Sequence, residues 1–410
     1  MARSTAAASA RKYFSDEMIA RISILAVIVI LLPFIYADRR MARRRPGRFH
    51  MKRAAMWLPC IAMLAYTAVL ACLRGFAPAD IRVLYVYLLI LGVVFIPAAI
   101  FTLFSFAGKL FAKRSAAWHG RMRTAGAFLA IAAAAVVAYG SFFGNKGVNV
   151  RSVEYACDRL PASFDGYRIA LFSDAHVGSY VWGSAKRLQA VVDTINNLRP
   201  DMIAFAGDLQ NMQPDELLPV MPMLSGLEAP DGVFSVLGNH DDGHYLNAGA
   251  AATMRSERVM CDRQRQMGWR LLTDGSATIR KNGDSIFIAG MYCDGKLAGQ
   301  RRTNPHKAMA GIPHEAFTVM LQHDPTSWRH TILPQTTAQL TLSGHTHGGQ
   351  MRIAGMSPAA MAYDEYDGMY YAKDGRALFV TTGINALVPF RFGMKPEVVV
   401  ITLRNKKRGK

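Results

Sequence analysis

Four long apolar runs in the first 147 residues constrain the fold of this chain more than any other feature. They span Ile22–Ala37, Ala54–Leu73, Val83–Gly108 and Thr124–Phe143. A helix that crosses a bilayer needs roughly 20 apolar residues, and each run reaches or approaches that length. The first run is followed by Asp38-Arg39-Arg40 and three more apolar runs, not by a small-residue cleavage site. The sequence therefore predicts a domain of four transmembrane helices over residues 1–147.

The basic charge of the chain is concentrated in this N-terminal part. The formal net charge is +19, and residues 1–150 hold 20 Lys/Arg against 4 Asp/Glu. Residues 151–410 are nearly balanced, with 28 Lys/Arg against 25 Asp/Glu. A nucleic-acid-binding domain would carry its own basic surface. We therefore expect the lipid bilayer, and not nucleic acid, as the partner of the basic region.

The loops between the apolar runs predict which side of the membrane each end occupies. Connection 38–53 carries eight Lys/Arg and connection 109–123 carries five, whereas connection 74–82 carries two. Basic loops stay in the cytoplasm. We expect an integral protein of a bacterial-type inner or plasma membrane, with both termini and everything after residue 144 on the extracytoplasmic face. The basic residues before the first run, Arg3 to Arg21, point the other way.

From residue 148 onward the pattern changes to short apolar runs separated by polar stretches. Eight of the apolar runs are predicted to form buried strands: Arg168–Ser173, Met202–Ala206, Val233–Leu237, Ser285–Ala289, Phe317–Leu321, Ala338–Ser343, Ala377–Thr382 and Glu397–Leu403. Helical periodicity appears over residues 183–198 and 216–226. Residues 148–410 are therefore predicted to form a second domain of layered α/β class.

Polar residues gather where five of these strands end. The corners are Asp174-Ala175-His176, Gly207-Asp208, Gly238-Asn239-His240-Asp241, Gln322-His323-Asp324-Pro325 and Gly344–Gln350. In the last corner His345 and His347 are two residues apart, so extended backbone points both imidazoles to one side. Taken singly, a strand-end Asp caps a helix and a lone His is an ordinary polar residue. Five such corners in succession predict a metal site, because neutral imidazole is the commonest metal ligand in proteins.

The order of these corners resembles the calcineurin-like metallophosphoesterase superfamily, whose pattern is D-x-H, G-D, G-N-H-[DE], a lone His and G-H-x-H. The resemblance covers roughly residues 165–405. The further stretches Thr381–Ile384 and Pro389–Phe392, behind membrane helices, are similar to the YkuE/YaeI-like membrane-associated branch. Many members have Gly-Asp-Leu-x-Asp where this chain has Asn211 in the last place. The resemblance implies a β-sandwich flanked by helices.

The resemblance also implies a centre of two divalent metals and assigns roles to eight residues. Its first metal would be held by Asp174, His176, Asp208 and His347, and its second by Asp208, Asn239, His323 and His345. Mixed His, Asp and Asn ligands suit Mn, Fe, Zn or Co. His240 would stabilise or protonate the leaving oxygen. From its position next to His240, Asp241 is expected either to orient His240 by accepting its second N–H or to cap a helix.

These expectations lead to a membrane-anchored metallophosphoesterase that hydrolyses a phosphodiester or pyrophosphate bond with a bridging hydroxide. The membrane domain favours a lipid-linked or cell-envelope phosphate as substrate. One alternative is a pyrophosphatase of lipid A synthesis that splits UDP-2,3-diacylglucosamine, which would need a cytoplasmic site. Another is a membrane receptor or transporter whose phosphoesterase-like domain only binds. The complete ligand set argues against that second alternative.

Residues 351–371, directly after the last corner, hold four Met and four Tyr without a period of 2 or 3.6. Methionine adapts to irregular apolar surfaces, and tyrosine suits boundaries between apolar and wet regions. The segment is expected either to wall the active site and accept the apolar part of a lipid substrate or to pack beneath a sheet edge.

Overall fold

The computed structural model describes residues 23–42, 50–73, 78, 80–110, 116–180, 185–246, 248–293 and 303–407. The chain divides into two compact units, Met1–Phe143 and Gly144–Lys410. We call them the membrane unit and the catalytic unit and describe each by itself.

The membrane unit consists of long helices. Residues 23–42 form one helix. The others are α2 (His50–Cys72), α3 (Ile81–Ile90), which continues through a π-helical turn (Leu91–Phe95) into α4 (Ile96–Leu110), and α5 (Ala116–Phe142). Three stretches of the described residues are long and apolar enough to cross a membrane: Arg53–Cys72, Ile81–Leu110 and Ala117–Phe142.

These three stretches contain the second, third and fourth predicted spans almost entirely, but the predicted first span is not among them. Residue 22, where that run begins, lies outside the described residues. In the helix over residues 23–42, 15 residues precede the charged group Asp38-Arg39-Arg40. That length falls short of the roughly 20 residues that a span requires. Three of the four predicted spans therefore correspond to described stretches that are long and apolar enough to cross a membrane.

Close packing joins α4 to α5. A Cβ atom built on Gly126 of α5 would lie 2.5 Å from the Cβ of Phe104 on α4. About three turns away, a Cβ on Gly92 of the π-helical turn that leads into α4 would lie 2.7 Å from Val137 Cγ1 of α5. Small residues let helix backbones approach closely where no hydrophobic effect drives them together. The α4–α5 pair is thus built as membrane helices are.

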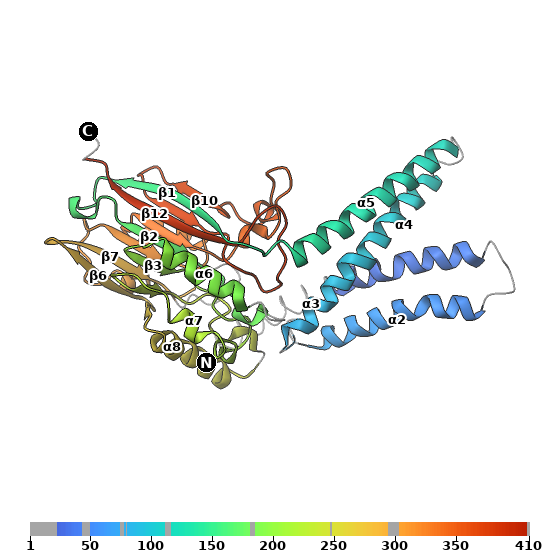
Figure 1. Cartoon of the computed structure of the whole chain (residues 1–410), viewed down its shortest axis with the longest axis horizontal. Coiled ribbons are helices and arrows are strands. Elements are labelled where there is room, and N and C mark those ends of the chain that lie inside the picture. Colours follow the sequence, from blue (N-terminus) through green and yellow to red (C-terminus); the bar gives the residue numbers. More distant parts are fainter. Residues whose placement is uncertain are drawn as a thin grey trace. The chain divides into compact units, whose positions relative to one another are not determined.

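The catalytic unit is built on two six-stranded sheets (Figure 1). Sheet A has the order β1 (Asn149–Cys157), β12 (Glu397–Asn405), β2 (Arg168–Phe172), β3 (Met202–Phe205), β4 (Val233–Ser235), β5 (Arg270–Leu271). Sheet B has the order β10 (Gly368–Tyr371), β11 (Ala377–Val380), β9 (Leu340–Ser343), β8 (Thr318–Leu321), β7 (Asp284–Gly290), β6 (Gly275–Lys281). All eight predicted strands are present.

Apolar side chains from both sheets fill the space between them. Ile169 and Leu171 of β2, Val319 of β8 and Leu342 of β9 belong to this core and are fully buried. Because successive residues of a strand face opposite sides, Ala170 and Phe172 belong to a second core on the outer face of sheet A. The result is the sandwich of layers expected for an α/β domain whose strands read as continuous apolar runs.

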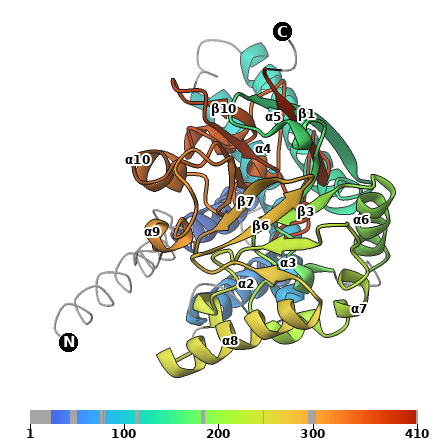
Figure 2. The same ribbon diagram turned by 90° about the vertical axis from the view of Figure 1, so that its left-hand side faces the viewer.

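Helices cover the outer faces of both sheets (Figure 2). Sheet A carries α6 (Ala185–Asn197), α7 (Met221–Leu224) and α8 (Ala250–Gln266), and sheet B carries α9 (Pro305–Ala308) and α10 (Leu333–Gln335). Short 3-10 or π turns complete the unit: Ala162–Phe164, Val177–Ser179, Pro214–Leu217, His244–Leu246, Trp328–Ile332, His347–Gly349 and Pro358–Met361.

Strand direction decides which end of the sandwich carries the polar corners. β2, β3 and β4 are parallel, as are β7, β8, β9 and β11. Their carboxyl ends meet at one edge, where loops can combine side chains from both sheets. β12 runs antiparallel to β2 and parallel to β1. The chain therefore enters the catalytic unit, at Asn149, on the same edge as the corners.

Candidate metal centre

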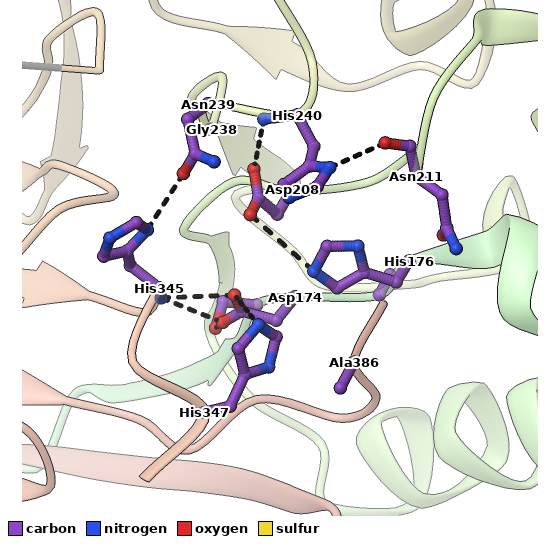
Figure 3. Close-up of polar contacts among 12 residues, drawn as sticks. Asp174, His176, Asp208, Asn211, Gly238, Asn239, His240, His345, His347 and Ala386 are labelled. Atoms are coloured by element: carbon purple, nitrogen blue, oxygen red, sulfur yellow. Dashed lines mark hydrogen bonds and ion pairs between the residues drawn. The ribbon is translucent and has the colours of Figure 1, made fainter. Parts of the chain in front are cut away.

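The seven side chains predicted as metal ligands converge at this edge, and Figure 3 labels six of them, all but His323. One group consists of Asp174, His176 and His347, and another of Asp208, His323 and His345, with the candidate ligand atoms of each within 4.8 Å of one another. Asn239 joins the second group, since its Oδ1 lies 2.9 Å from His345 Nδ1.

Asp208 stands between the two groups. Its Oδ2 is 3.0 Å from His323 Nε2 and 3.7 Å from His176 Nε2. On the far side of the first group, His347 Nε2 lies 3.5 Å from Asp174 Oδ1. Two ligand atoms on one tetrahedral cation, each about 2.1 Å from it, are about 3.4 Å apart. The distances fit candidate ligand atoms around two neighbouring cation positions, with Asp208 between the two groups.

Backbone strain accompanies this convergence. Five of the predicted ligands have positive φ angles: Asp174 (54°), His176 (41°), Asp208 (62°), His345 (73°) and His347 (50°). Left-handed backbone costs a residue with a side chain roughly 1–2 kcal/mol. Residues held in such conformations cluster at functional sites, where the surrounding structure enforces them. Each ligand sits in a sharp turn directly after a strand, and this turn aims its side chain at the centre.

Two glycines make room for the carboxylates. A Cβ atom on Gly238 would lie 2.0 Å from Asp208 Oδ1, and one on Gly344 would lie 2.5 Å from Asp174 Oδ2. Both distances are shorter than any non-bonded contact, so a larger residue at either position would displace a ligand. Glycine is thus required at the start of the Gly-Asn-His-Asp and Gly-His-Thr-His corners because a ligand carboxylate lies directly against its Cα.

Backbone carbonyl groups orient the imidazoles. Nδ1 of His323 donates to Ala206 O at 2.7 Å, and Nδ1 of His347 donates to Asn385 O at 3.0 Å. Nδ1 of His240 likewise donates to Asn211 O at 2.6 Å. A proton held on Nδ1 leaves Nε2 of the neutral ring with its lone pair facing the centre. Such outer contacts fix the tautomer and the direction of metal-binding histidines.

The donor set fits divalent cations. His176 is fully buried, yet neither of its ring nitrogens has a hydrogen-bond partner among the described residues. An unpaired buried polar group costs about 1–3 kcal/mol. Nδ1 of His345 and Nε2 of His323 face each other at 3.3 Å beside the Asn239 oxygen. Lone pairs directed at a common point are satisfied by a cation at that point.

Burial and charge prepare these groups as ligands. Burial lowers the pKa of His176 well below its usual value, and lowers the pKa values of His345 and His347 in the same direction. These rings are neutral at physiological pH. Burial also lowers the pKa of His323, but the Asp208 carboxylate outweighs it and raises that pKa to about 10. Because a bound metal needs the free lone pair, metal binding at His323 releases a proton.

Tyr245 supports two residues of this centre and was not predicted from the sequence. Its ring stacks on His240, with centroids 4.2 Å apart and an interplanar angle of 11°. Its hydroxyl accepts a hydrogen bond from Asn239 Nδ2 at 3.1 Å. Holding the NH2 group of Asn239 in this way turns the amide oxygen toward His345.

Asp241 does not have the role that was predicted for it. Its carboxylate accepts four backbone N–H groups, those of Asp208, Leu209, Gln210 and Gly238, at 2.8–3.1 Å. His240 is instead oriented by the Asn211 carbonyl. The alternative, a helix cap, is also wrong because these N–H groups belong to loops. Asp241 ties the Gly-Asp corner to the Gly-Asn corner and thereby fixes the position of Asp208.

Two further residues anchor ligands from the loops after β9 and β11. The Tyr363 hydroxyl lies 3.1 Å from His345 Nε2, leaving Nδ1 of that ring for the centre. The guanidinium of Arg391, fully buried, donates through Nη2 to the carbonyls of Thr382, Gly383 and Asn385 at 2.7–2.9 Å. The last of these carbonyls also binds His347. Arg391 lies in the stretch Pro389–Phe392 singled out in the sequence, but the sequence predicted no role for it.

Comparison with known proteins agrees with this geometry. The family model for calcineurin-like phosphoesterases matches residues 167–349. The metallophosphoesterase YkuE of Bacillus subtilis (strain 168) is 31% identical over 297 residues, which cover 68% of this chain and 96% of that protein. The chain belongs to the calcineurin-like metallophosphoesterase family.

Other similar proteins include a transmembrane protein with metallophosphoesterase domain from Danio rerio. It is 28% identical over 286 residues, which cover 67% of this chain and 62% of that protein. A solved dimetal phosphatase from Danio rerio aligns with a TM-score of 0.33 and 12% identity, covering 54% of this chain and 88% of that chain.

Family membership makes this metallophosphoesterase a phosphoester hydrolase. Members of the family typically use two divalent metals, and the clustered residues are the candidate ligands for them. The three candidate spans and the transmembrane relatives associate the protein with a membrane.

Proposed function

We propose that this metallophosphoesterase is anchored in a bacterial-type inner or plasma membrane and hydrolyses a phosphodiester or pyrophosphate bond of a lipid-linked or cell-envelope phosphate. The catalytic unit would lie on the extracytoplasmic face. Two bound cations, Mn, Fe, Zn or Co, would offset the phosphate charge and activate a water molecule. Asp174, His176, Asp208 and His347 would hold one cation, and Asp208, Asn239, His323 and His345 the other.

His240 is the residue that we assign to the leaving oxygen. Its Nδ1 is engaged by Asn211 O, so Nε2 is the atom that exchanges a proton with substrate. Stacking on Tyr245 holds the plane of the ring. General acid catalysis by a positioned side chain typically contributes 10²–10⁴-fold to the rate.

The main observation in favour of a membrane-bound substrate is the edge at which the chain enters the catalytic unit. Asn149, the first residue of β1, follows Phe142, the last residue of α5, after six residues. Asn145 and Val148 share a small cavity with Ile384 and Asn385. The Asn385 carbonyl binds His347. The metal edge of the unit is thus the edge at which the chain enters it, and the connection from α5 to that edge is six residues long.

An exposed apolar surface beside the metal centre supports the same proposal. In residues 351–361, the side chains of Ile353, Met356 and Met361 are 49%, 72% and 92% exposed. A packing role beneath the sheet is therefore wrong for these three residues. Tyr363, two residues further on, contacts the ligand His345. Apolar surface kept exposed next to a site marks an interaction with an apolar partner, here the chain of a lipid substrate.

The alternatives fit fewer observations. A UDP-2,3-diacylglucosamine-type pyrophosphatase needs a cytoplasmic site, which the basic loops at 38–53 and 109–123 oppose. A receptor or transporter that only binds would not need a complete set of converging ligands in strained turns.

The substrate class is tested with the detergent-solubilised protein and added Mn. The Met356→Ser/Met361→Ser variant should hydrolyse bis-p-nitrophenyl phosphate like the wild type, because both side chains point to solvent. Its hydrolysis of a long-chain lipid phosphate should fall about tenfold, from the loss of apolar contact. Equal rates on the lipid substrate, or equal loss on both substrates, would contradict the lipid assignment. Met254→Ser, at a similarly exposed methionine on α8, is the matched control.

The side of the membrane is tested by fusing reporters after Lys410. Alkaline phosphatase, which is active outside the cytoplasm, should be active in the fusion. Fluorescence from a reporter that folds only in the cytoplasm would reverse the topology and restore the nucleotide-sugar alternative.

A further inference from the structure

The membrane unit contains a cavity of about 640 Å³ between the helix over residues 23–42, α4 and α5. That volume lies within the range of small-molecule sites. Its wall follows helical spacing. Leu32, Ile35 and Arg39 lie at i, i+3 and i+7 on the first helix, and Leu103, Phe106 and Lys109 lie at a similar spacing on α4. Each helix therefore presents apolar side chains at one end of the cavity and a cation at the other.

Basic side chains are concentrated at one end of this cavity. The cavity is lined by Arg39, Arg40, Lys109, His119 and Arg123. His119 and Arg123 are four residues apart on α5 and so lie on one face of that helix. No carboxylate lines the cavity among the described residues. Ionisable residues at the level of membrane helices are costly and mark a function.

The carboxylate closest in sequence is already engaged. Asp38 pairs with Arg53, whose Nε and Nη2 each lie 2.5 Å from one of its oxygens. Asp80, the other acidic residue in the described part of this unit, pairs with Arg82 at 2.7 Å. The cations of the cavity are therefore left without a protein counter-charge among the described residues.

Three polar atoms in the cavity wall are also left unsatisfied. The Tyr36 hydroxyl, His119 Nδ1 and Arg123 Nε are buried and have no hydrogen-bond partner among the described residues. The ammonium of Lys109 lies 4.4 Å from the centre of the Tyr36 ring. Buried donors of this kind are normally paired, and each unpaired one calls for an explanation. A phosphate oxygen would accept hydrogen bonds from all three side chains.

We propose that this cavity binds one anionic phospholipid. The headgroup phosphate is held by Lys109, His119 and Arg123 with the Tyr36 hydroxyl, and an acyl chain lies along Leu32, Ile35, Leu103 and Phe106. The apolar half of the wall distinguishes a lipid from a free phosphate, because a soluble anion gains nothing from those side chains. Basic pockets between membrane helices on the cytoplasmic side bind anionic headgroups in this way.

This site is separate from the metal centre. Along α5, His119 and Phe142 are 23 residues apart, which is roughly 35 Å of helix. The phospholipid therefore lies at the end of α5 opposite to the one that continues into the catalytic unit. The lipid here is a bound partner and not the substrate proposed above.

Native mass spectrometry of the full-length protein in neutral detergent tests the proposal. The protein is titrated with dioleoyl phosphatidylglycerol and with dioleoyl phosphatidylcholine, which share their acyl chains. Wild type should bind phosphatidylglycerol about tenfold more tightly. Lys109→Gln/Arg123→Gln should lower that affinity by about tenfold or more. Arg121→Gln, at an exposed position on the same helix, should leave it unchanged.

A second variant, Tyr36→Phe, removes a single hydroxyl and should weaken phosphatidylglycerol binding a few-fold. It tests the proposal independently should the double variant fail to fold. Equal affinity for the two lipids, unchanged binding in both variants, or equal loss in Arg121→Gln would overturn the proposal. So would full competition by water-soluble glycerophosphoglycerol, since the apolar wall would then play no part. Hydrolysis of bis-p-nitrophenyl phosphate, measured in parallel, should be retained in every variant, which separates this result from the proposed catalytic function.

Discussion

The metal centre and the basic cavity of the membrane unit are both arranged around charge, but they are built from different parts. At the metal centre, carboxylates, an amide and imidazoles come from five loops at strand ends, several of them in strained backbone. In the basic cavity, cations come from regular helices at helical spacing. Loops on a rigid scaffold can place atoms for chemistry, whereas helix faces align charge and apolar surface for binding. Catalysis in this protein is therefore expected from the first region alone.

The largest effect should come from Asp208, which the two cation sites share. Asp208→Asn should lower the rate of bis-p-nitrophenyl phosphate hydrolysis by roughly 10³-fold or more, because a charged ligand is lost where the phosphate charge must be offset. Metal content, measured by inductively coupled plasma mass spectrometry, should fall with it, as it should in His345→Ala. Phosphatidylglycerol binding should be unchanged. A variant that keeps both its metals and its rate would show that Asp208 is not the shared ligand.

A smaller loss is expected for His240→Ala, which removes a proton donor and leaves the ligands in place. The rate should fall by about 10²–10⁴-fold while metal content stays at the wild-type level. A substrate with a very acidic leaving group should recover part of the rate, since such a group needs no proton. If metal is lost from His240→Ala and retained in His345→Ala, the two roles have been exchanged.

The smallest effect at the metal centre should come from Tyr245→Phe. This variant keeps the ring that stacks on His240 and removes the hydroxyl that holds Asn239. Outer contacts of this type contribute about 10–100-fold to metal affinity or activity. The midpoint of reactivation by Mn should rise while the rate at saturating Mn changes little. Tyr371→Phe, at an exposed tyrosine, is the control. A lower rate at saturating Mn with an unchanged midpoint would show that the hydroxyl acts on the substrate.

Sequence patterns predicted the buried parts of the catalytic unit better than its exposed parts. The eight predicted strands are short, apolar and covered on both faces. β1 and β6 were missed because about half of their side chains are exposed, so neither strand forms the continuous apolar run by which the others were recognised. The β6–β7 hairpin had a readable signal in Asn282-Gly283, where both residues have positive φ angles. Two-residue turns of this composition are the strongest short-range hairpin signal.

The metal ligands could be predicted from the sequence, whereas the residues that hold the ligands in place could not. Ligand residues belong to motifs of fixed spacing, so the seven could be named from the sequence. Tyr245, Tyr363 and Arg391 act through contacts that depend on how whole loops fold, which spacing does not encode. Asp241 shows the limit most clearly. Its place beside His240 suggested a contact between the two side chains, but the loop turns its carboxylate toward the backbone of residues 208–210.

The position of β12 in sheet A has a consequence for the biosynthesis of this protein. β12 is the last strand in the described part of the chain, yet it lies between β1 and β2, which are made about 230–250 residues earlier. During translation the sheet has a gap in its middle, and both neighbouring strands present unpaired N–H and C=O groups. Such edges pair readily with other chains. Polypeptides that stop before residue 397 would carry inserted membrane helices and an unfinished sheet, so premature termination should yield substrates for membrane proteases and not a shortened enzyme.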